Sequence, residues 1–188
     1  MDMVLSTPRN FVPGDTPMER AKVEKDGLDV LQDIHRYAAT GFGSIVESDF
    51  DRMKWFGVYR QKPKESGYFM LRLKIPGGQL RGEQMDVVAD IAEVYGHGLA
   101  DITTRQTFQY HWLTIDQFPD IFSRLAAVGM TTSGACGDDT RNVTGCPVAG
   151  IDRAEIRDGT PELMAVSAHL TDNREFSNLP RKYKISIA

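Results

Sequence analysis

The segment from Asp101 to Leu113 constrains the fold most, because its threonines and aromatic residues favour a β-strand. Side chains alternate between the two faces of a strand. One face then carries hydrogen-bonding groups: Thr103, Arg105, Thr107, Gln109 and His111. The other carries Thr104, Gln106, Phe108, Tyr110 and Trp112, whose aromatic rings can pack against helices. The polar row is either the solvated face of an antiparallel sheet or a binding surface for a large, carboxylate-rich ligand.

The residues before and after this strand predict an α+β fold. Residues 54–60 and 68–76 read as strands, and residues 81–95 and 116–128 read as amphipathic helices. We therefore expect a ferredoxin-like half domain over residues 54–134, an antiparallel sheet with helices on one face. Residues 1–53 form an arm followed by a helical run from Thr16, which Gly41 ends. Residues 135–188 begin a second α+β unit, with a helix over 161–170.

Composition excludes several classes of protein. The chain has 188 residues, of which 41% are hydrophobic, so it can build a core. A net charge of −4 argues against a nucleic-acid partner, and no apolar run is long enough to cross a membrane. The two cysteines, Cys136 and Cys146, are too few for a disulfide framework, and their spacing matches no compact metal site. We expect a cytoplasmic protein.

Several cations have no acidic neighbour on their own strand. Arg72 and Lys74 share one face of the strand at 68–76, and Lys182 and Lys184 share one face near the C-terminus. This pattern indicates an anion site, although Lys74 could equally lie on a solvated basic face. Arg141 lies in an irregular loop, where the alternative is an ion pair with Asp138 or Asp139 that pins the loop.

Four motifs in order resemble the siroheme-dependent nitrite and sulfite reductase family, in its N-terminal third. They are Gly67-Tyr-Phe-Met-Leu-Arg-Leu-Lys-Ile-Pro-Gly-Gly78, Thr103-Thr-Arg-Gln-Thr-Phe-Gln-Tyr-His111, Cys136-Gly-Asp-Asp-Thr-Arg-Asn142 and Leu179-Pro-Arg-Lys-Tyr-Lys184. The resemblance begins near Lys54 and continues to the last residue. It implies the six-electron reduction of sulfite to sulfide or of nitrite to ammonia, with ferredoxin as the electron donor.

The resemblance also assigns roles to individual residues. It places Arg72, Arg141, Lys182 and Lys184 around the substrate anion, on the distal side of siroheme. Thr103, Arg105, Gln109, His111 and Asn142 would contact the cofactor, which is rich in carboxylates. Lys184 favours sulfite, the more highly charged anion, because nitrite reductases of plants usually have Asn at the second position of Lys-x-Lys.

The chain departs from the family pattern in its cysteines. The family joins siroheme to a [4Fe–4S] cluster through cysteines in two paired motifs downstream of the lysine pair, and neither Cys136 nor Cys146 matches them. The sequence also stops within a strand-like segment. We therefore expect a portion of a longer reductase, inactive by itself. The alternative is a non-catalytic module that binds a tetrapyrrole or an anion.

Overall fold

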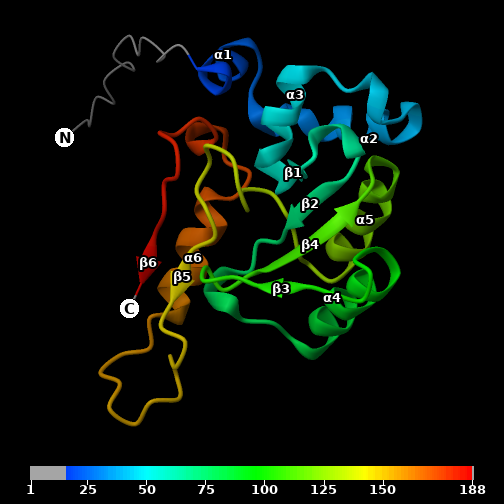
Figure 1. Ribbon diagram of the computed structural model, residues 1–188. Helices are drawn as coiled ribbons and strands as arrows, with labels where there is room; N and C mark the ends of the chain where they lie inside the picture. Colours follow the sequence, from blue (N-terminus) through cyan, green and yellow to red (C-terminus); the bar gives the residue numbers. More distant parts are fainter. Residues whose placement is uncertain (1–15, 188) are drawn as a thin grey trace, which may run out of the picture.

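The computed structural model describes residues 16–187, so the predicted arm before Thr16 lies outside the described residues. A four-stranded antiparallel sheet, in the order β1-β2-β4-β3, forms the centre, and a two-stranded parallel sheet, β5-β6, lies to one side (Figure 1). The helices are α1 Pro17–Glu24, α2 Val30–Thr40, α3 Glu47–Arg52, α4 Gly82–Tyr95, α5 Phe118–Ala127 and α6 Thr160–Leu170. The strands are β1 Val58–Arg60, β2 Phe69–Arg72, β3 Asp101–Ile102, β4 Phe108–Leu113, β5 Thr144–Gly145 and β6 Ser186–Ile187.

The central sheet has one apolar face, which α4 and α5 cover (Figure 1). Leu71 of β2 and Tyr110 of β4 are paired across the sheet, and both are fully buried on this face. The Tyr110 hydroxyl donates to the Val88 carbonyl of α4 at 3.0 Å, so the buried phenol has a partner. The predicted α+β fold, an antiparallel sheet with helices on one face, is confirmed.

The segment 101–113 is a hairpin and not the continuous strand that its composition predicts. The chain reverses between Thr103 and Gln106: the Gln106 amide donates to the Thr103 carbonyl, and the Thr103 amide donates to the Thr107 carbonyl. Gln106 adopts a left-handed φ of 55°, which few residues other than glycine adopt. Both ends of its side-chain amide bond to the backbone of Gly145 at 2.9 Å, so a distant contact stabilises this turn.

A second difference concerns Trp112, which was predicted to pack with Phe108 and Tyr110. The register of β2 against β4 shifts between Phe69 and Leu71, and Trp112 has a φ of 61°. The extra residue of this bulge turns Leu113 into the core and leaves Trp112 37% exposed, stacked on the His97 ring. The alternation of faces therefore holds for Phe108 to Tyr110 and fails at the end of β4.

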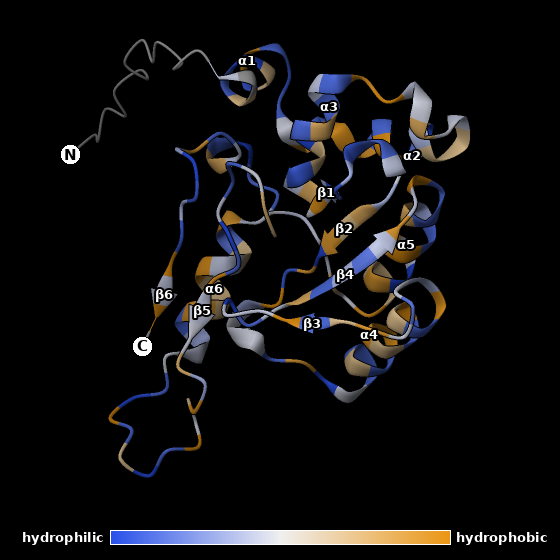
Figure 2. Ribbon diagram, viewed as in Figure 1, coloured by the Kyte–Doolittle hydropathy of each residue, from blue (hydrophilic) through white to orange (hydrophobic). Residues whose placement is uncertain are grey.

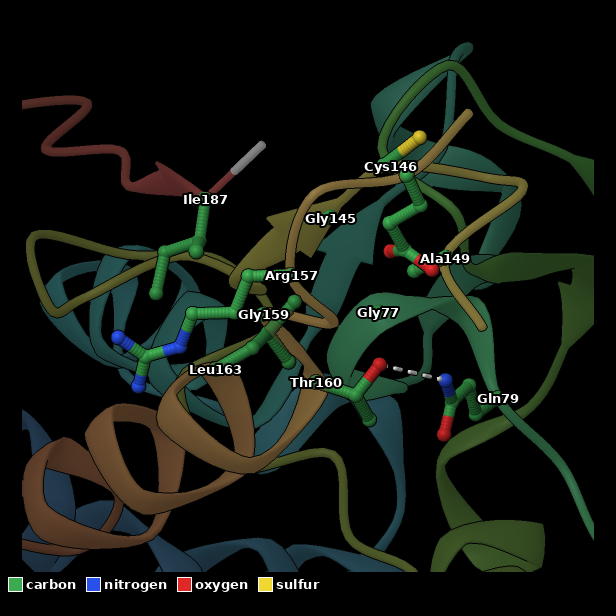
Figure 3. A pocket seen from close by; sticks show the side chains of 11 residues that line it. Gly77, Gln79, Gly145, Cys146, Ala149, Arg157, Gly159, Thr160, Leu163 and Ile187 are labelled. Carbon is green, nitrogen blue, oxygen red and sulfur yellow. Dashed lines mark hydrogen bonds between the residues drawn. The ribbon is translucent and has the colours of Figure 1, made fainter. Parts of the chain in front are cut away.

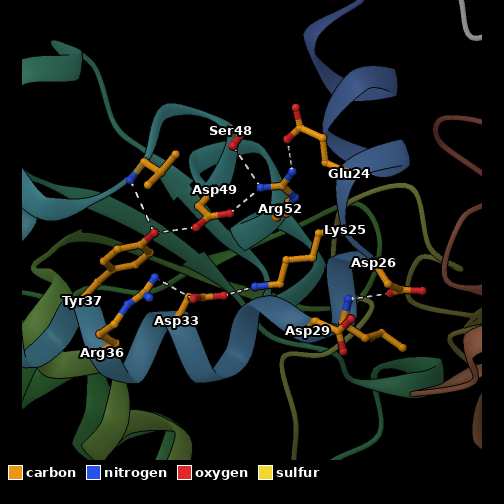
Figure 4. Close-up of polar contacts among 12 residues, drawn as sticks. Glu24, Lys25, Asp26, Asp29, Asp33, Arg36, Tyr37, Ser48, Asp49 and Arg52 are labelled. Atoms are coloured by element: carbon orange, nitrogen blue, oxygen red, sulfur yellow. Dashed lines mark hydrogen bonds and ion pairs between the residues drawn. The ribbon is translucent and has the colours of Figure 1, made fainter.

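The helical run from Thr16 is also interrupted, because Asp26 caps a short 3-10 turn through its bond to the Leu28 amide. The helices on either side, α1 and α2, contribute buried residues to the core that lies against the sheet. Figure 4 shows the polar contacts that join them to α3. The buried Arg52 guanidinium donates to Asp49 and Glu24 at 2.6 Å, and the Tyr37 hydroxyl donates to Asp49 at 2.5 Å.

The irregular segment from Thr132 to Thr140 is buried along its whole length, although it contains no helix or strand. It passes between the central sheet and the segment that leads to β6.

The predicted helix over 161–170 is present as α6. Figure 2 shows β2 as largely hydrophobic and the segment before β6 as hydrophilic, as expected for a strand inside a core and a chain carrying exposed lysines. Within residues 16–187, no helix is long and apolar enough to cross a bilayer.

Candidate functional site

Arg72 lies where β2 passes the buried loop, on the sheet face opposite the helices. Its Nε donates to Gln109 Oε1 of the paired strand at 3.0 Å, and a second guanidinium nitrogen bonds to the same oxygen. A third nitrogen lies 3.2 Å from Cys136 Sγ. Two of the predicted residues, Arg72 and Gln109, are thus joined directly. Their polar row forms the floor of the candidate site.

Tyr59 and Cys136 belong to this site and were not predicted. The Tyr59 hydroxyl is hydrogen-bonded to Cys136, and burial raises the pKa of the phenol, with the nearby thiol raising it further. The positive charges of Arg141 and Arg72 lower the pKa of Tyr59, so both guanidinium groups are close to it. Cys136 opens a motif that the sequence showed, but nothing in the sequence connects it with Tyr59.

Arg105 lies in the turn of the β3–β4 hairpin, not in a strand. Its guanidinium donates to the Asn142 carbonyl and, at 3.5 Å, to the Ile185 carbonyl, so it links the hairpin to the segments that lead into β5 and β6. Its Nε is buried without an acceptor among the described residues. Burial lowers the pKa of Arg105, and the charges of Arg141 and Arg72 lower it further, which brings three guanidinium groups into one region.

Arg141 and the two lysines come from neighbouring strand segments. The Arg141 amide donates to the Tyr183 carbonyl at 3.2 Å, so Lys182 and Lys184 flank the residue to which Arg141 is bonded. The Arg141 Nε donates to the Gly137 carbonyl at 3.0 Å. Both lysines are exposed, and neither makes a hydrogen bond or ion pair with another described residue. Lys182 has a φ of 65°, so the two lysines do not share one strand face as predicted.

The predicted alternative for Arg141, an ion pair with Asp138 or Asp139, is not formed. Asp138 pairs with Lys22 at 3.3 Å, and Asp139 faces Lys74. Lys74 is not on a solvated face, because the loop covers it and leaves it 3% exposed. Burial lowers the pKa of Lys74, and burial raises the pKa of Asp139 to about 6. Within residues 16–187, no carboxylate lies within ion-pair distance of Arg72, Arg105 or Arg141.

Three other predicted residues already make contacts within the protein. Asn142 is buried and gives both amide hydrogens to the Ile75 and Arg105 carbonyls, so it has no donor left for a ligand. Thr103 accepts from the Arg105 amide at 3.3 Å. His111 Nε2 lies 3.2 Å from Asp101 Oδ2, at the far end of β4. These contacts fix the hairpin and the loop around the arginines.

The two cysteines lie in different places. Cys136 is buried beside Arg72, whereas Cys146 lines a cavity of about 30 Å³ between β5 and α6 (Figure 3). This cavity has room for a molecule the size of water and not for a macrocycle. No group of three or more histidine, cysteine or acidic side chains among the described residues could hold a metal ion.

The arginine site can therefore hold an anion. Guanidinium groups remain charged at any accessible pH and bind carboxylates or oxyanions through two parallel hydrogen bonds. Three of them without acidic partners leave positive charge uncompensated in a partly buried region. Such a region favours a ligand that brings several negative groups.

Known proteins resemble this chain in sequence and in fold. Residues 60–128 match the family "Nitrite/Sulfite reductase ferredoxin-like half domain", and residues 136–188 match "Nitrite and sulphite reductase 4Fe-4S domain". A ferredoxin–nitrite reductase of Leptolyngbya laminosa is 42% identical over 94% of this chain and 36% of its own length. A ferredoxin sulfite reductase of Mycolicibacterium paratuberculosis is 33% identical, over 90% of this chain and 34% of its own.

A solved structure supports the same relation. The NirA protein of Mycobacterium tuberculosis is 32% identical and superposes with a TM-score of 0.84, over 91% of this chain and 34% of that protein. The chain spans about a third of the length of these relatives. With matching sequence families and a matching fold, the chain belongs to the siroheme-dependent nitrite and sulfite reductase family.

Proposed function

We propose that this chain is the part of a ferredoxin-dependent sulfite or nitrite reductase that binds the substrate anion and one side of siroheme. The observation that carries this proposal is the group of Arg72, Arg105 and Arg141, which come together without a carboxylate partner among the described residues. The family reduces sulfite to sulfide or nitrite to ammonia, each by six electrons. Both reactions begin with an anion that must be held and neutralised.

The residues present fit siroheme. Among residues 16–187, the buried Arg105 Nε has no acceptor and Arg72 and Arg141 have no acidic partner, as expected where a carboxylate-rich ligand completes the hydrogen bonding. Arg105 and Gln109 would hold the cofactor, with Thr103, Asn142 and His111 fixing the backbone and side chains around them. Siroheme, when bound, supplies the iron that the anion coordinates and the path by which electrons reach it.

Four cations of this chain would act on the substrate. Arg72 and Arg141 are partly buried, so their charges are screened less than those of the exposed Lys182 and Lys184. The arginines orient and neutralise the anion. The lysines can bring protons to the oxygen atoms that leave as water. Their position beside Arg141 follows from the bond between the Arg141 amide and the Tyr183 carbonyl.

The [4Fe–4S] cluster does not fit the cysteines of this chain. Cys136 and Cys146 are apart, and the described residues offer no set of cluster ligands. We propose that the longer protein supplies the cluster and that the 188-residue chain alone does not turn over. Ferredoxin as electron donor and a cytoplasmic location stay predictions, as does the division of the chain at residues 54 and 135.

The test is reconstitution of the chain and of the longer reductase with siroheme, followed by absorbance and by turnover of sulfite and nitrite. We expect the longer protein to reduce at least one anion, and Arg105→Ala to lower the amount of siroheme retained. Retention of siroheme by the longer protein without reduction of either anion would favour the alternative, a non-catalytic tetrapyrrole- or anion-binding module.

A further inference from the structure

Lys22 connects the N-terminal helix α1 with the loop of the candidate site, although 116 residues separate it from Asp138. Its ammonium lies 3.0 Å from Glu19, 3.3 Å from Asp138 Oδ2 and 3.3 Å from the Leu179 carbonyl. The side chain is 6% exposed, and that of Asp138 is 2% exposed. The contact is thus a buried ion pair between two parts of the chain that the sequence does not connect.

Asp138 needs this partner because a buried carboxylate without a counter-charge is strongly unfavourable. It lies in the same loop as Arg141 and directly follows Gly137, whose carbonyl accepts from the Arg141 Nε. Arg141 is the cation nearest to Asp138 in the sequence, three residues further along the same loop, and could replace Lys22 as its partner. An Arg141 paired with Asp138 would have its charge neutralised and its donors occupied.

We propose that Lys22 is a positioning residue of the anion site: by binding Asp138, it keeps Arg141 free for the substrate. This inference rests on the proposed function, because it assumes that Arg141 binds the anion. It explains why the loop can contain two aspartates next to the site without cancelling its charge. Asp138 is held by Lys22, and Asp139 faces Lys74 on the far side of the loop.

The same ammonium also fixes the lysine segment. The Leu179 amide donates to the Asp138 carbonyl at 2.7 Å, while the Leu179 carbonyl accepts from Lys22. Two residues earlier, the Ser177 carbonyl accepts from Trp55 Nε1, and the Ser177 hydroxyl donates to Asp26, both at 2.6 Å. The chain is thus anchored shortly before Lys182 and Lys184, neither of which pairs with another residue of the described part of the chain.

The test is a set of variants of the full 188-residue chain, titrated with inorganic sulfite and followed by NMR of the arginine side chains. In Lys22→Met, Asp138 is left without its cation and pairs with Arg141, so sulfite binds at least about tenfold more weakly. In Lys22→Met/Asp138→Asn, the competing carboxylate is gone, and most of the affinity returns. Asp138→Asn alone binds sulfite like the wild type, and Lys22→Arg retains most of the affinity.

The signal of the Arg141 side chain separates positioning from stability, because removing both charges of a buried ion pair also removes the unpaired carboxylate and restores stability. If Lys22 served only to hold the fold together, the Arg141 Nε–Hε signal of the folded Lys22→Met variant would not shift. Lys25→Met is the matched control, because Lys25 directly follows α1 and pairs with Asp33 of α2 rather than with Asp138 (Figure 4). We expect this control to bind sulfite like the wild type.

Equal sulfite affinity in Lys22→Met and the wild type would overturn the inference, as would equally weak binding in the single and double variants. If the wild-type chain itself does not respond to sulfite, the proposed function fails for this chain. The inference is then decided by the Arg141 Nε–Hε signal alone. It should shift on Lys22→Met and return toward its wild-type position in the double variant, and an unchanged signal would contradict it. If Lys22→Met does not fold, the sulfite affinities of Lys22→Met/Asp138→Asn and Asp138→Asn are compared instead. Weak binding of sulfite by the double variant, with normal binding by Asp138→Asn, would contradict the inference.

Discussion

Arg72 and Gln109 are paired across the central sheet, and two nitrogens of the guanidinium donate to the single Gln109 Oε1. The arrangement aims the arginine at the loop without neutralising it, because a side-chain amide carries no net charge. A carboxylate at position 109 would hold the guanidinium in the same place and cancel its charge. This pair therefore combines a fixed direction with a free positive charge.

The first prediction follows from this pair. Arg72→Ala in the longer reductase should lower kcat/KM for the anion about a hundredfold, since loss of one contact to the developing charge typically costs ~3 kcal/mol. The free energy of unfolding should change little, because Arg72 is only half-buried. Arg124→Ala is the control, since Arg124 is a surface arginine paired with Asp120 on α5. Wild-type turnover by the Arg72 variant would remove this residue from the site.

A related charge test uses the partner. Gln109→Glu keeps an acceptor for Arg72 and adds a negative charge to the floor of the site. We expect binding of the anion to weaken more than in Gln109→Ala, which removes the acceptor but not the positive charge. Sulfite affinity of the two variants is measured side by side. The opposite order would mean that the direction of Arg72 matters more than the net charge.

The stability of the sheet gives another prediction, because Tyr110 and Trp112 were expected to be equivalent and are not. Tyr110→Ala should lower the free energy of unfolding by about 3–5 kcal/mol, the usual cost of emptying a buried aromatic position. Trp112→Ala should cost much less, since its ring is partly exposed. Urea denaturation of both variants measures the difference. Similar costs would contradict the bulge that separates the two environments.

The two aromatic residues show what the sequence could and could not predict. Alternation of polar and apolar residues correctly assigned Arg72 and Leu71 to opposite faces, and helical spacing correctly located α4 and α5. Both are local properties of the chain. The turn at Gln106 and the bulge at Trp112 break the alternation, and neither has the glycine or asparagine that usually marks such a backbone.

The candidate site was predictable only in part for the same reason. The strand pattern and the motifs identified Arg72, Arg105, Arg141 and the lysine pair as cations of interest, and the resemblance assigned them to the site. Cys136 contacts Arg72 across 64 residues of chain, Tyr59 contacts Cys136 across 77, and Lys22 contacts Asp138 across 116; no local pattern marks such contacts. Burial of Lys74 likewise depends on a loop that arrives 58 to 66 residues later.

The buried Asp139 predicts a dependence of stability on pH. Burial raises its pKa from 3.8 to about 6 in the folded chain. Between these values, the native state holds a proton that the unfolded state has released, so the contribution of Asp139 to stability falls as the pH rises. The contribution is fully present below pH 3.8, is lost through pH 6, and does not change further above that pH.

The measurement is the free energy of unfolding of the wild type and of Asp139→Asn between pH 4 and 7. The wild type should lose stability relative to the variant as the pH rises to 6. Asp90→Asn, at an exposed position of α4, controls for the loss of one negative charge. A constant difference between the wild type and Asp139→Asn would mean that Asp139 is ionised in both states throughout this range.

The last prediction concerns the substrate. Lys184 is exposed and unpaired with any other described residue, and the Arg141 amide is bonded to the carbonyl of its neighbour Tyr183, so we expect the charge of Lys184 to act on the anion site. Sulfite carries up to two negative charges and nitrite carries one, so an added cation should favour sulfite. The relative with 42% identity is named a nitrite reductase and that with 33% a sulfite reductase. The ratio of kcat/KM for sulfite and nitrite in the longer reductase decides between the two anions, because specificity is a difference of affinities.

We expect Lys184→Asn to move this ratio toward nitrite, whereas Arg181→Asn, three residues earlier and also exposed, should leave it unchanged. A strong preference for nitrite that Lys184→Asn does not alter would show that Lys184 has no part in selecting the substrate.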